Sequence, residues 1–339
     1  MSKFDLSAQV AAAARRVVPV AFLGLALLSS CSDDDDAVTT PAAPATITFT
    51  QAGLYPEGVQ YDAPNKRFLV TSLATGKIGQ VQDDGTYSLF ADNPALVSTI
   101  GLHIDGNLLL VAVSDPGANP ARTSPATQRK MAHLAIYNRD TPSNTPVVLD
   151  LDAASPNHPN HFANDIAVDA QGNAYVTDSF APVIYKVTPN RTVTVFLDNT
   201  QLTAPAGMFG LNGIVYHPDG YLLVAKSDNG AIYKVPLNNP AGFTQVAISQ
   251  NLAAADGLLL QDNNTLQVVS NAQARVFRLV TTNGFTAATL SGTFVTQPQF
   301  PTTLARRDGT SYVLYANLDA LFSGRTPAVS QYSINRVDF

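Results

Sequence analysis

The chain has 339 residues, of which 45% are hydrophobic and only 14% are charged. That apolar content is enough for a large core, which excludes disorder for most of the chain. The net charge of -6 offers no basic face, so we expect no nucleic-acid partner.

Residues 1–31 are typical of a secretory signal peptide that ends at a lipidated cysteine. Arg15 and Arg16 precede an apolar run over residues 17–28, which is shorter than the roughly 20 residues of a membrane-spanning helix. The tetrapeptide LSSC (residues 28–31) resembles a bacterial lipobox, and Cys31 is the only cysteine. We therefore expect an exported protein, anchored by a lipid on Cys31 to the outer membrane or cell surface. An ordinary signal peptide that ends near a cysteine is the alternative.

Residues 32–45 are expected to form a disordered tether. Asp33–Asp36 resemble the surface-export signal of some Gram-negative lipoproteins, and a merely solvated linker is the alternative. The following Pro-, Ala- and Thr-rich residues 37–45 show no core-forming pattern.

Residues 46–339 repeat one pattern of short strands separated by Asn-Gly, Asp-Gly or Asn-Asn turns. The equivalent apolar anchors are Val59, Leu102, Ile166, Ile214, Leu258 and Leu304, at separations of 43, 64, 48, 44 and 46 residues. A period of about 40 to 50 residues with several strands per unit is typical of propeller blades. The sequence thus predicts an all-β fold, a single six-bladed β-propeller. A sandwich or two stacked β-domains would not explain the repeated register.

Two segments do not follow the repeat, and each predicts a structural feature. The N-terminal segment over residues 45–51 is expected to add a strand to the last blade, beside residues 329–337. The one long separation marks a Pro/Gly-rich insertion over residues 115–130, which we expect to be a loop and a lid over one propeller face.

The position two residues before each anchor forms a column of chemical interest. It holds Glu57, Ile100, Asn164, Asn212, Asp256 and Thr302. First strands of propeller blades line the central channel, so the carboxylates and amides should converge there. Oxygen ligands without Cys or His suit Ca²⁺, with another divalent cation as the alternative. The competing interpretation is that Asn and Asp are ordinary turn residues that precede strands.

The motifs YPEGV (55–59), ANDIAV (163–168), LNGIVYHPDG (211–220) and ADGL (255–258) resemble the SMP-30/gluconolactonase superfamily, to which paraoxonases are related. The resemblance implies a calcium-dependent six-bladed propeller that hydrolyses lactones or related esters. It also implies that Glu57, Asn164, Asn212 and Asp256 hold the metal. Asp256 would in addition accept a proton. We expect a small-molecule lactone or ester as the partner and a monomeric protein.

Other positions depart from the family pattern or add weaker candidates. Phe162 stands where sugar lactonases have an arginine, which favours an apolar ester or lactone. Ser114 and Asp115 stand in the place of a paraoxonase histidine. His103 is a second candidate for proton transfer, although an ordinary strand histidine is the alternative. His161, in the segment SPNHPNHF (155–162), is expected to touch substrate at the channel mouth.

A function of a different class is also compatible with these residues. A non-catalytic propeller displayed on the envelope could bind a ligand or partner and use the same ion to hold its blades together. The column of oxygen ligands does not separate these hypotheses, because calcium serves structure and catalysis with the same ligands.

Overall fold

The computed structural model describes residues 43–141 and 145–339. All of them belong to the compact unit Ala43–Phe339. The predicted signal peptide, its Cys31 and most of the predicted tether lie outside the described residues. No helix among the described residues is long and apolar enough to cross a membrane.

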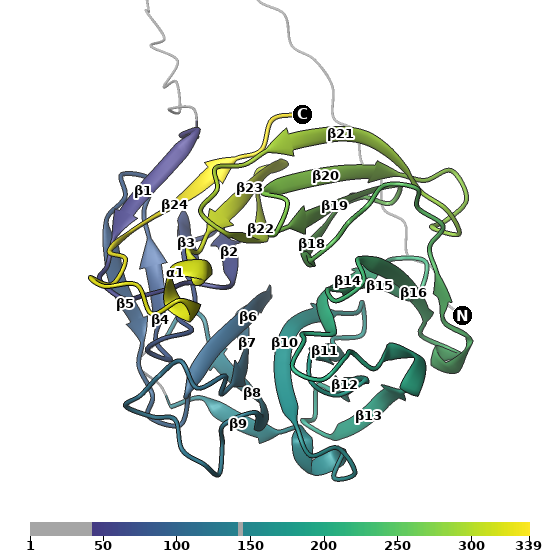
Figure 1. Cartoon of the computed structure of the whole chain (residues 1–339), viewed down its shortest axis with the longest axis horizontal. Coiled ribbons are helices and arrows are strands. Elements are labelled where there is room, and N and C mark those ends of the chain that lie inside the picture. The colour runs from purple at the N-terminus through teal and green to yellow at the C-terminus, as the bar shows by residue number, and fades with distance from the viewer. Residues whose placement is uncertain (1–42, 142–144) are drawn as a thin grey trace, which may run out of the picture. The chain divides into compact units, whose positions relative to one another are not determined.

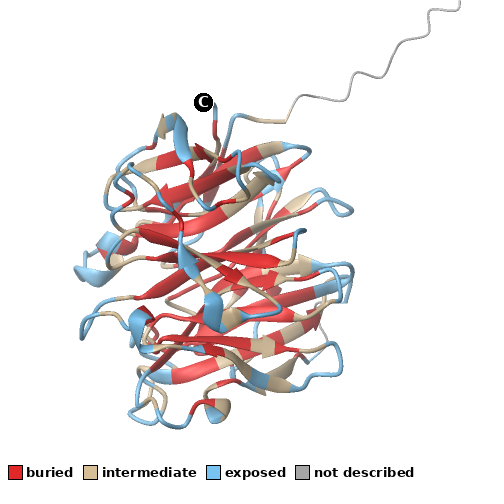
Figure 2. Cartoon of the chain, turned by 90° about the vertical axis from the view of Figure 1, so that its right-hand side faces the viewer, coloured by how far each residue is buried: buried red, intermediate tan, exposed pale blue. Residues whose placement is uncertain are grey.

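The described structure is built almost entirely from strands, which confirms the all-β prediction. The exceptions are one short α-helix, α1 (Leu318–Phe322), and the 3₁₀ turns η1 (Asp152–Ala154), η2 (Thr200–Leu202) and η3 (Pro240–Gly242). The sheets form a propeller-like arrangement around a centre (Figure 1). Buried residues follow the strands, and exposed residues gather in the loops (Figure 2).

Four sheets are separate and four-stranded. One contains β2 (Val59–Asp62), β3 (Arg67–Val70), β4 (Ile78–Val81) and β5 (Tyr87–Ala91). The next contains β14 (Leu211–His217), β15 (Tyr221–Lys226), β16 (Ala231–Pro236) and β17 (Thr244–Gln245). A third contains β18 (Ala255–Asp262), β19 (Thr265–Ser270), β20 (Arg275–Val280) and β21 (Thr289–Val295). The last contains β22 (Pro301–Arg307), β23 (Thr310–Tyr315), β24 (Gln331–Arg336) and β1 (Thr46–Thr50).

The fifth sheet has eight strands, so the described residues form four separate four-stranded blades, not six. It contains β6 (Ser98–Asp105), β7 (Leu108–Ser114), β8 (Lys130–Asn138), β9 (Val147–Asp150), β10 (His161–Val168), β11 (Ala174–Asp178), β12 (Val183–Val187) and β13 (Val193–Asp198). Parallel pairing of β8 with β10, at Lys130 with His161 and Met131 with Phe162, joins its halves. The expectation of six separate blades fails here because this short ladder continues across the boundary between two repeats.

The N-terminal strand closes the last sheet, as the sequence predicted. β1 pairs antiparallel with β24, from Thr46 opposite Asn335 to Thr50 opposite Gln331. The Tyr55 backbone N–H also donates to the Tyr332 hydroxyl at 3.0 Å. The beginning and the end of the described unit are therefore joined by backbone and side-chain hydrogen bonds.

The first strands of the repeats, β2, β6, β10, β14, β18 and β22, surround the centre and contact one another in that order (Figure 1). β22 in turn contacts β2, which closes the cycle. At this closure the hydroxyls of Thr302 and Thr303 both donate to the Glu57 carbonyl, at 2.8 and 2.9 Å. The backbone that carries Glu57 is thus held by the last repeat.

The insertion over residues 115–130 is a loop tied down by its own polar side chains. The Asp115 carboxylate accepts hydrogen bonds from the hydroxyls of Thr123 and Thr127, both at 2.7 Å. The Asn119 amide donates to the Val97 carbonyl at 2.6 Å. Pro116 lines the cavity described below. The insertion is therefore a hydrogen-bonded part of the cavity wall.

Candidate functional site

A bulge interrupts five of the inner strands at the predicted column. The register shifts between Thr99 and Leu102, Ala163 and Ile166, Leu211 and Ile214, Ala255 and Leu258, and Pro301 and Leu304. Each shift includes the column residue and the residue after it. A bulge breaks the strict alternation of a strand and redirects a side chain. The same local device thus positions Asn164, Asn212 and Asp256.

Glycine after the column residue lets neighbouring inner strands approach closely. A Cβ on Gly213 would lie 2.3 Å from the Asp256 carbonyl oxygen, and one on Gly257 would lie 2.7 Å from that of Thr302. Both distances are shorter than side chains tolerate against backbone atoms. The glycines therefore bring the strands that carry the column close together.

A cavity of about 360 Å³ is lined by all four predicted metal ligands, Glu57, Asn164, Asn212 and Asp256. Polar neighbours in its lining are Ser227, Asp228 and Asn271. Its apolar lining includes Leu73, Phe162, Met208, Phe209, Phe300 and Phe322. Met208 and Phe322 are 47% and 56% exposed, so the apolar lining reaches solvent. The cavity combines a polar group of oxygen ligands with an extensive apolar surface.

The carboxylates of this cavity are buried close to one another. Burial is the main reason that the pKa of Glu57 lies well above its ordinary value, and the charges of Asp256 and Asp165 raise it further. Burial likewise raises the pKa of Asp256 to about 7, against the opposing hydrogen bonds of Asn271 and Asn212. The cavity thus disfavours unpaired negative charge and would favour a bound cation.

Serines fix the orientation of both asparagine amides. The Asn164 Nδ2 donates to Ser179 Oγ at 2.9 Å, and the Asn212 Nδ2 donates to Ser227 Oγ at 2.9 Å. Each serine in turn donates to a backbone carbonyl of the next repeat, that of Leu211 for Ser179, at 2.5 Å. The amide nitrogens are therefore occupied, and the amide oxygens are left to face other partners.

Two oxygens of the site are buried without a hydrogen-bond partner among the described residues, Glu57 Oε2 and Asn164 Oδ1. Leaving a buried acceptor unsatisfied costs about 1–3 kcal/mol. A cation that prefers oxygen ligands would satisfy both atoms at once. The residues of the cavity therefore fit a hard divalent cation.

Several residues of the site were not predicted from the sequence. Asn271 donates to Asp256 Oδ2 at 3.0 Å. Ser179, Ser227 and Asn271 all lie fifteen positions after a column residue, so the repeat register contains a signal for them. Asp165 was also missed. Both of its oxygens accept backbone N–H groups, from Ile166 at 2.8 Å and Ile214 at 3.1 Å.

His103 does not share the cavity of Glu57 and Asp256. It lines a second cavity of about 230 Å³, together with Asp165 and residues that follow the bulges. Burial lowers the pKa of His103, against the opposing charge of Asp105. The structure therefore does not bring His103 together with the other predicted catalytic residue, Asp256.

The two predicted pocket residues have different positions. Phe162 is buried and lines the cavity. His161 is not among the lining residues, and both of its ring nitrogens have partners. Its Nδ1 lies 2.7 Å from Asp178 Oδ2, and its Nε2 lies 2.9 Å from the His158 carbonyl oxygen. The structure places His161 behind the cavity wall.

A second group of possible cation ligands lies on β8, β9 and η1. The ligand atoms of His133, Asp150 and Asp152 lie within 4.8 Å of one another. Asp152 Oδ1 also accepts the Ala132 N–H at 2.9 Å. Asp150 is exposed, and such groups are common without a metal. The group is separate from the cavity of Glu57, whose lining contains none of these residues.

The fold is all-β and propeller-like, and the candidate oxygen ligands meet in one cavity at its inner strands. These two features define the class of protein: a propeller with a candidate cation site. The chain belongs to the SMP-30/gluconolactonase/LRE-like family, whose model matches residues 55–307. The resemblance seen in the sequence motifs is thereby confirmed. None of the curated protein sequences compared with the chain is significantly similar to it.

Solved structures share the fold at low sequence identity. The major allergen Mala s 1 of Malassezia sympodialis is 17% identical with a TM-score of 0.69, over 88% of this chain and 97% of that one. A gluconolactonase from Xanthomonas campestris is 14% identical with a TM-score of 0.61, over 86% and 89%. The calcium-binding protein regucalcin from Agrobacterium tumefaciens is 15% identical with a TM-score of 0.58, over 85% and 92%. At these identities the likeness concerns the fold.

Proposed function

We propose that this protein is a calcium-dependent hydrolase of lactones or related esters. The observation that carries the proposal is the pair of buried, unpartnered oxygens, Glu57 Oε2 and Asn164 Oδ1, in a cavity that Asp256 also lines. A gluconolactonase and a calcium-binding regucalcin among the structures with this fold support the same reading.

Glu57, Asn164, Asn212 and Asp256 would hold the ion. Oxygen-only ligands of mixed charge suit Ca²⁺, and another divalent cation is the alternative. When bound, such an ion polarises a substrate carbonyl and stabilises the negative charge that develops on its oxygen.

The protein's own groups would bind the substrate and move the proton. Asp256, held at Oδ2 by the Asn271 amide, is our candidate to accept a proton from the attacking water. Phe162 and Phe209 would hold an apolar part of the substrate and keep water away from it. His103 is no longer favoured for proton transfer, because it lines the other cavity.

We also propose that the chain is a six-bladed propeller and that the eight-stranded sheet corresponds to two blades joined by the pairing of β8 with β10. The closed cycle of six first strands supports this proposal. Three of these strands, β10, β14 and β18, supply one candidate ligand each, and Glu57 lies just before β2, so every ligand comes from a different repeat.

The alternative is a non-catalytic propeller in which the ion only holds the repeats together. The contribution of ligands by separate repeats favours it, because an ion would cross-link them. Hydrolysis of a panel of lactones and aryl esters, with and without chelator, separates the hypotheses. The hydrolase proposal expects turnover that is lost with chelator and with Asp256→Asn while the protein stays folded. Absence of turnover, together with a chelator-induced fall in melting temperature, would favour the structural ion.

We further propose a monomer that is exported and anchored to the cell envelope by a lipid on Cys31. The support for export and anchoring is the pattern of residues 1–45. Membrane fractionation of the Cys31→Ser variant tests this proposal. We expect the variant to leave the membrane fraction, and an unchanged membrane fraction would contradict the lipid anchor.

A further inference from the structure

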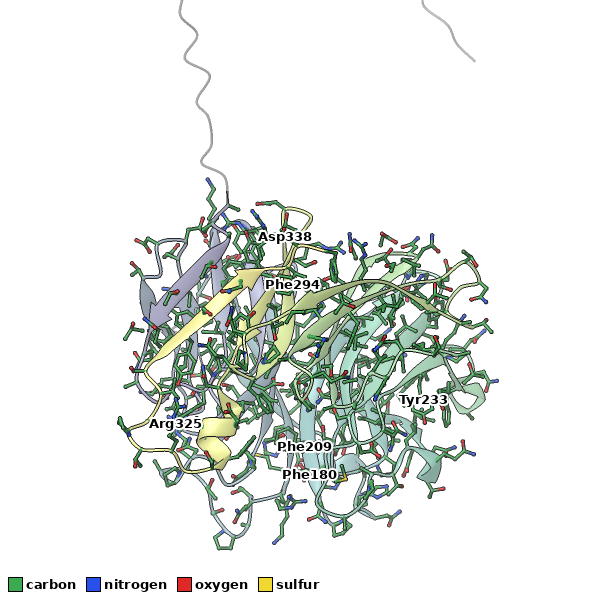
Figure 3. The ribbon with its side chains drawn as sticks, turned by 45° about the horizontal axis from the view of Figure 1, so that its top comes forward. Phe180, Phe209, Tyr233, Phe294, Arg325 and Asp338 are labelled. Atoms are coloured by element: carbon green, nitrogen blue, oxygen red, sulfur yellow. The ribbon has the colours of Figure 1, made fainter. Side chains whose placement is uncertain are left out.

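Three phenylalanines form an aromatic wall at the cavity: Phe162, Phe180 and Phe209. Their ring centroids lie 5.2, 5.2 and 5.0 Å apart. Phe162 and Phe209 line the cavity, and Phe180 packs against both. Figure 3 shows Phe180 and Phe209 side by side. The Arg129 guanidinium lies 4.0 Å from the Phe180 ring centroid, so the wall is also packed from the side of the insertion.

A single buried carboxylate, that of Asp178, holds the backbone of this wall. Its Oδ1 accepts the N–H of Phe162 at 2.8 Å and that of Phe180 at 3.0 Å. Its Oδ2 accepts the Tyr185 hydroxyl at 3.0 Å and lies 2.7 Å from His161 Nδ1. The backbones of two of the three wall residues are therefore hydrogen-bonded to the same side chain.

The His161 ring extends this arrangement. Its two nitrogens face two acceptors, the Asp178 carboxylate and the His158 carbonyl, so the ring matches a protonated imidazolium that donates at both positions. Burial lowers the pKa of His161, but the hydrogen bond and charge of Asp178, with the charge of Asp152, outweigh it and raise the pKa. The groups that face the ring are Asp178, Tyr185, Asp152 and His158.

The equivalent position in other repeats lacks this carboxylate. Asp178 pairs with the residue just before the column position, Ala163. The residues paired at the same place in the other bulged strands are Val113, Lys226, Ser270 and Tyr315. The fold therefore forms this hairpin without a buried Asp–His–Tyr group. The group occurs in the repeat that carries two of the three wall residues.

We propose that Asp178 and His161 are positioning residues that fix the aromatic wall and thereby set how large an apolar substituent the cavity accepts. The inference rests on the proposed function for its substrate, an ester or lactone with a bulky apolar group. The hydrogen bonds that Asp178 accepts from Phe162 and Phe180, and its close contact with His161, hold the wall in one position, so the cavity is shaped before a substrate enters. A rigid wall favours substituents that fill it and rejects those that would require it to move.

The test uses the absence of tryptophan from the chain. Phe209→Trp introduces a single fluorophore into the wall, and Asp178→Asn is then added to it. The control is Asp169→Asn, because Asp169 is also buried in this repeat and accepts a hydrogen bond from a tyrosine, Tyr175, at 3.0 Å. We expect Asp178→Asn, but not Asp169→Asn, to red-shift the emission and increase its quenching by acrylamide.

A kinetic measurement on proteins that keep Phe209 gives the second readout. The ratio of kcat/KM for p-nitrophenyl octanoate to that for the acetate should fall by about fourfold or more in Asp178→Asn, the equivalent of one methylene group losing its burial. The change should lie mainly in KM, and Asp169→Asn should keep the parent ratio. Tyr185→Phe, which removes one donor to Asp178, serves if Asp178→Asn does not fold.

The outcomes are distinguishable from those of the proposed function. If the parent hydrolyses neither ester, the hydrolase proposal fails, and the emission and quenching data still decide whether Asp178 positions the wall. If both readouts stay at the parent values, or if Asp169→Asn changes them equally, Asp178 only stabilises the fold and the inference is overturned.

Discussion

Ser179 Oγ accepts a hydrogen bond from Asn164 Nδ2 at 2.9 Å and leaves Asn164 Oδ1 buried without a partner among the described residues. The same hydroxyl donates to the Leu211 carbonyl at 2.5 Å. Asn212 and Ser227 form the same two kinds of hydrogen bond one repeat later. A serine outside the candidate ligand set thus decides which end of each amide is free to bind a cation.

Ser179→Ala should weaken calcium binding by about 10- to 100-fold, the usual cost of removing a residue that orients a metal ligand. Without the hydroxyl, the Asn164 amide can rotate and present its nitrogen. Isothermal titration calorimetry with Ca²⁺ measures the change. Ser270→Ala is the matched control, because the buried Ser270 hydroxyl also donates to a backbone carbonyl, that of Ala253, whereas Ser179 is hydrogen-bonded to a candidate ligand. Equal losses in both variants would contradict the orienting role.

Glu57→Gln should reduce calcium affinity by at least about 100-fold. The substitution keeps the shape of the side chain and removes one unit of negative charge, which at about 4 Å from an ion contributes several kcal/mol. Calorimetric titration against the parent protein provides the measurement. A Glu57→Gln protein that binds Ca²⁺ as tightly as the parent would remove Glu57 from the ligand set.

Calcium should raise the melting temperature more at about pH 8 than at about pH 5. The pKa of Glu57 is raised in the fold and that of Asp256 is raised to about 7. At these two carboxyls the metal-free fold holds protons more tightly than the unfolded chain does, so their contribution to its stability is lost as the pH rises from about 4 to about 7. A cation removes this penalty by balancing the ionised carboxylates. Scanning calorimetry at both pH values, with calcium or chelator, tests the sign, and a larger gain at low pH would contradict it.

Gly213→Ala should destabilise the protein by about 1–3 kcal/mol, as overpacking of a close contact does. The added Cβ would lie 2.3 Å from the Asp256 carbonyl oxygen, and backbone atoms cannot easily move away. Gly242→Ala is the control, because the atoms nearest to its Cβ would belong to the end of the Asn239 side chain. Urea unfolding compares the two variants, and equal stabilities would show that the strands can separate without cost.

Much of the fold could be predicted because each repeat has the same order of strands and turns in its sequence. The anchors Val59 to Leu304 recur at the spacing of one blade, and the pairing of β1 with β24 follows from strands left over at the two ends. The convergence of Glu57, Asn164, Asn212 and Asp256 was predictable for the same reason, since equivalent positions in a ring of repeats face one centre.

Other features depend on contacts between repeats, which no local pattern records. The parallel pairing at His161 and Phe162 merges two repeats into one sheet because distant segments happen to align. His103 lines the second cavity together with Asp165 and Ile166 of the next repeat, so its surroundings do not follow from its own strand.

Residue types and their register thus determined the class of fold and the candidate ligands, because both depend on spacing along the chain. The tertiary structure decided which amide oxygens are free, which carboxylates share a cavity, and which aromatic rings form its wall. Those outcomes depend on hydrogen bonds and packing between residues far apart in sequence, such as Ser179 with Leu211 and Asp178 with Phe162.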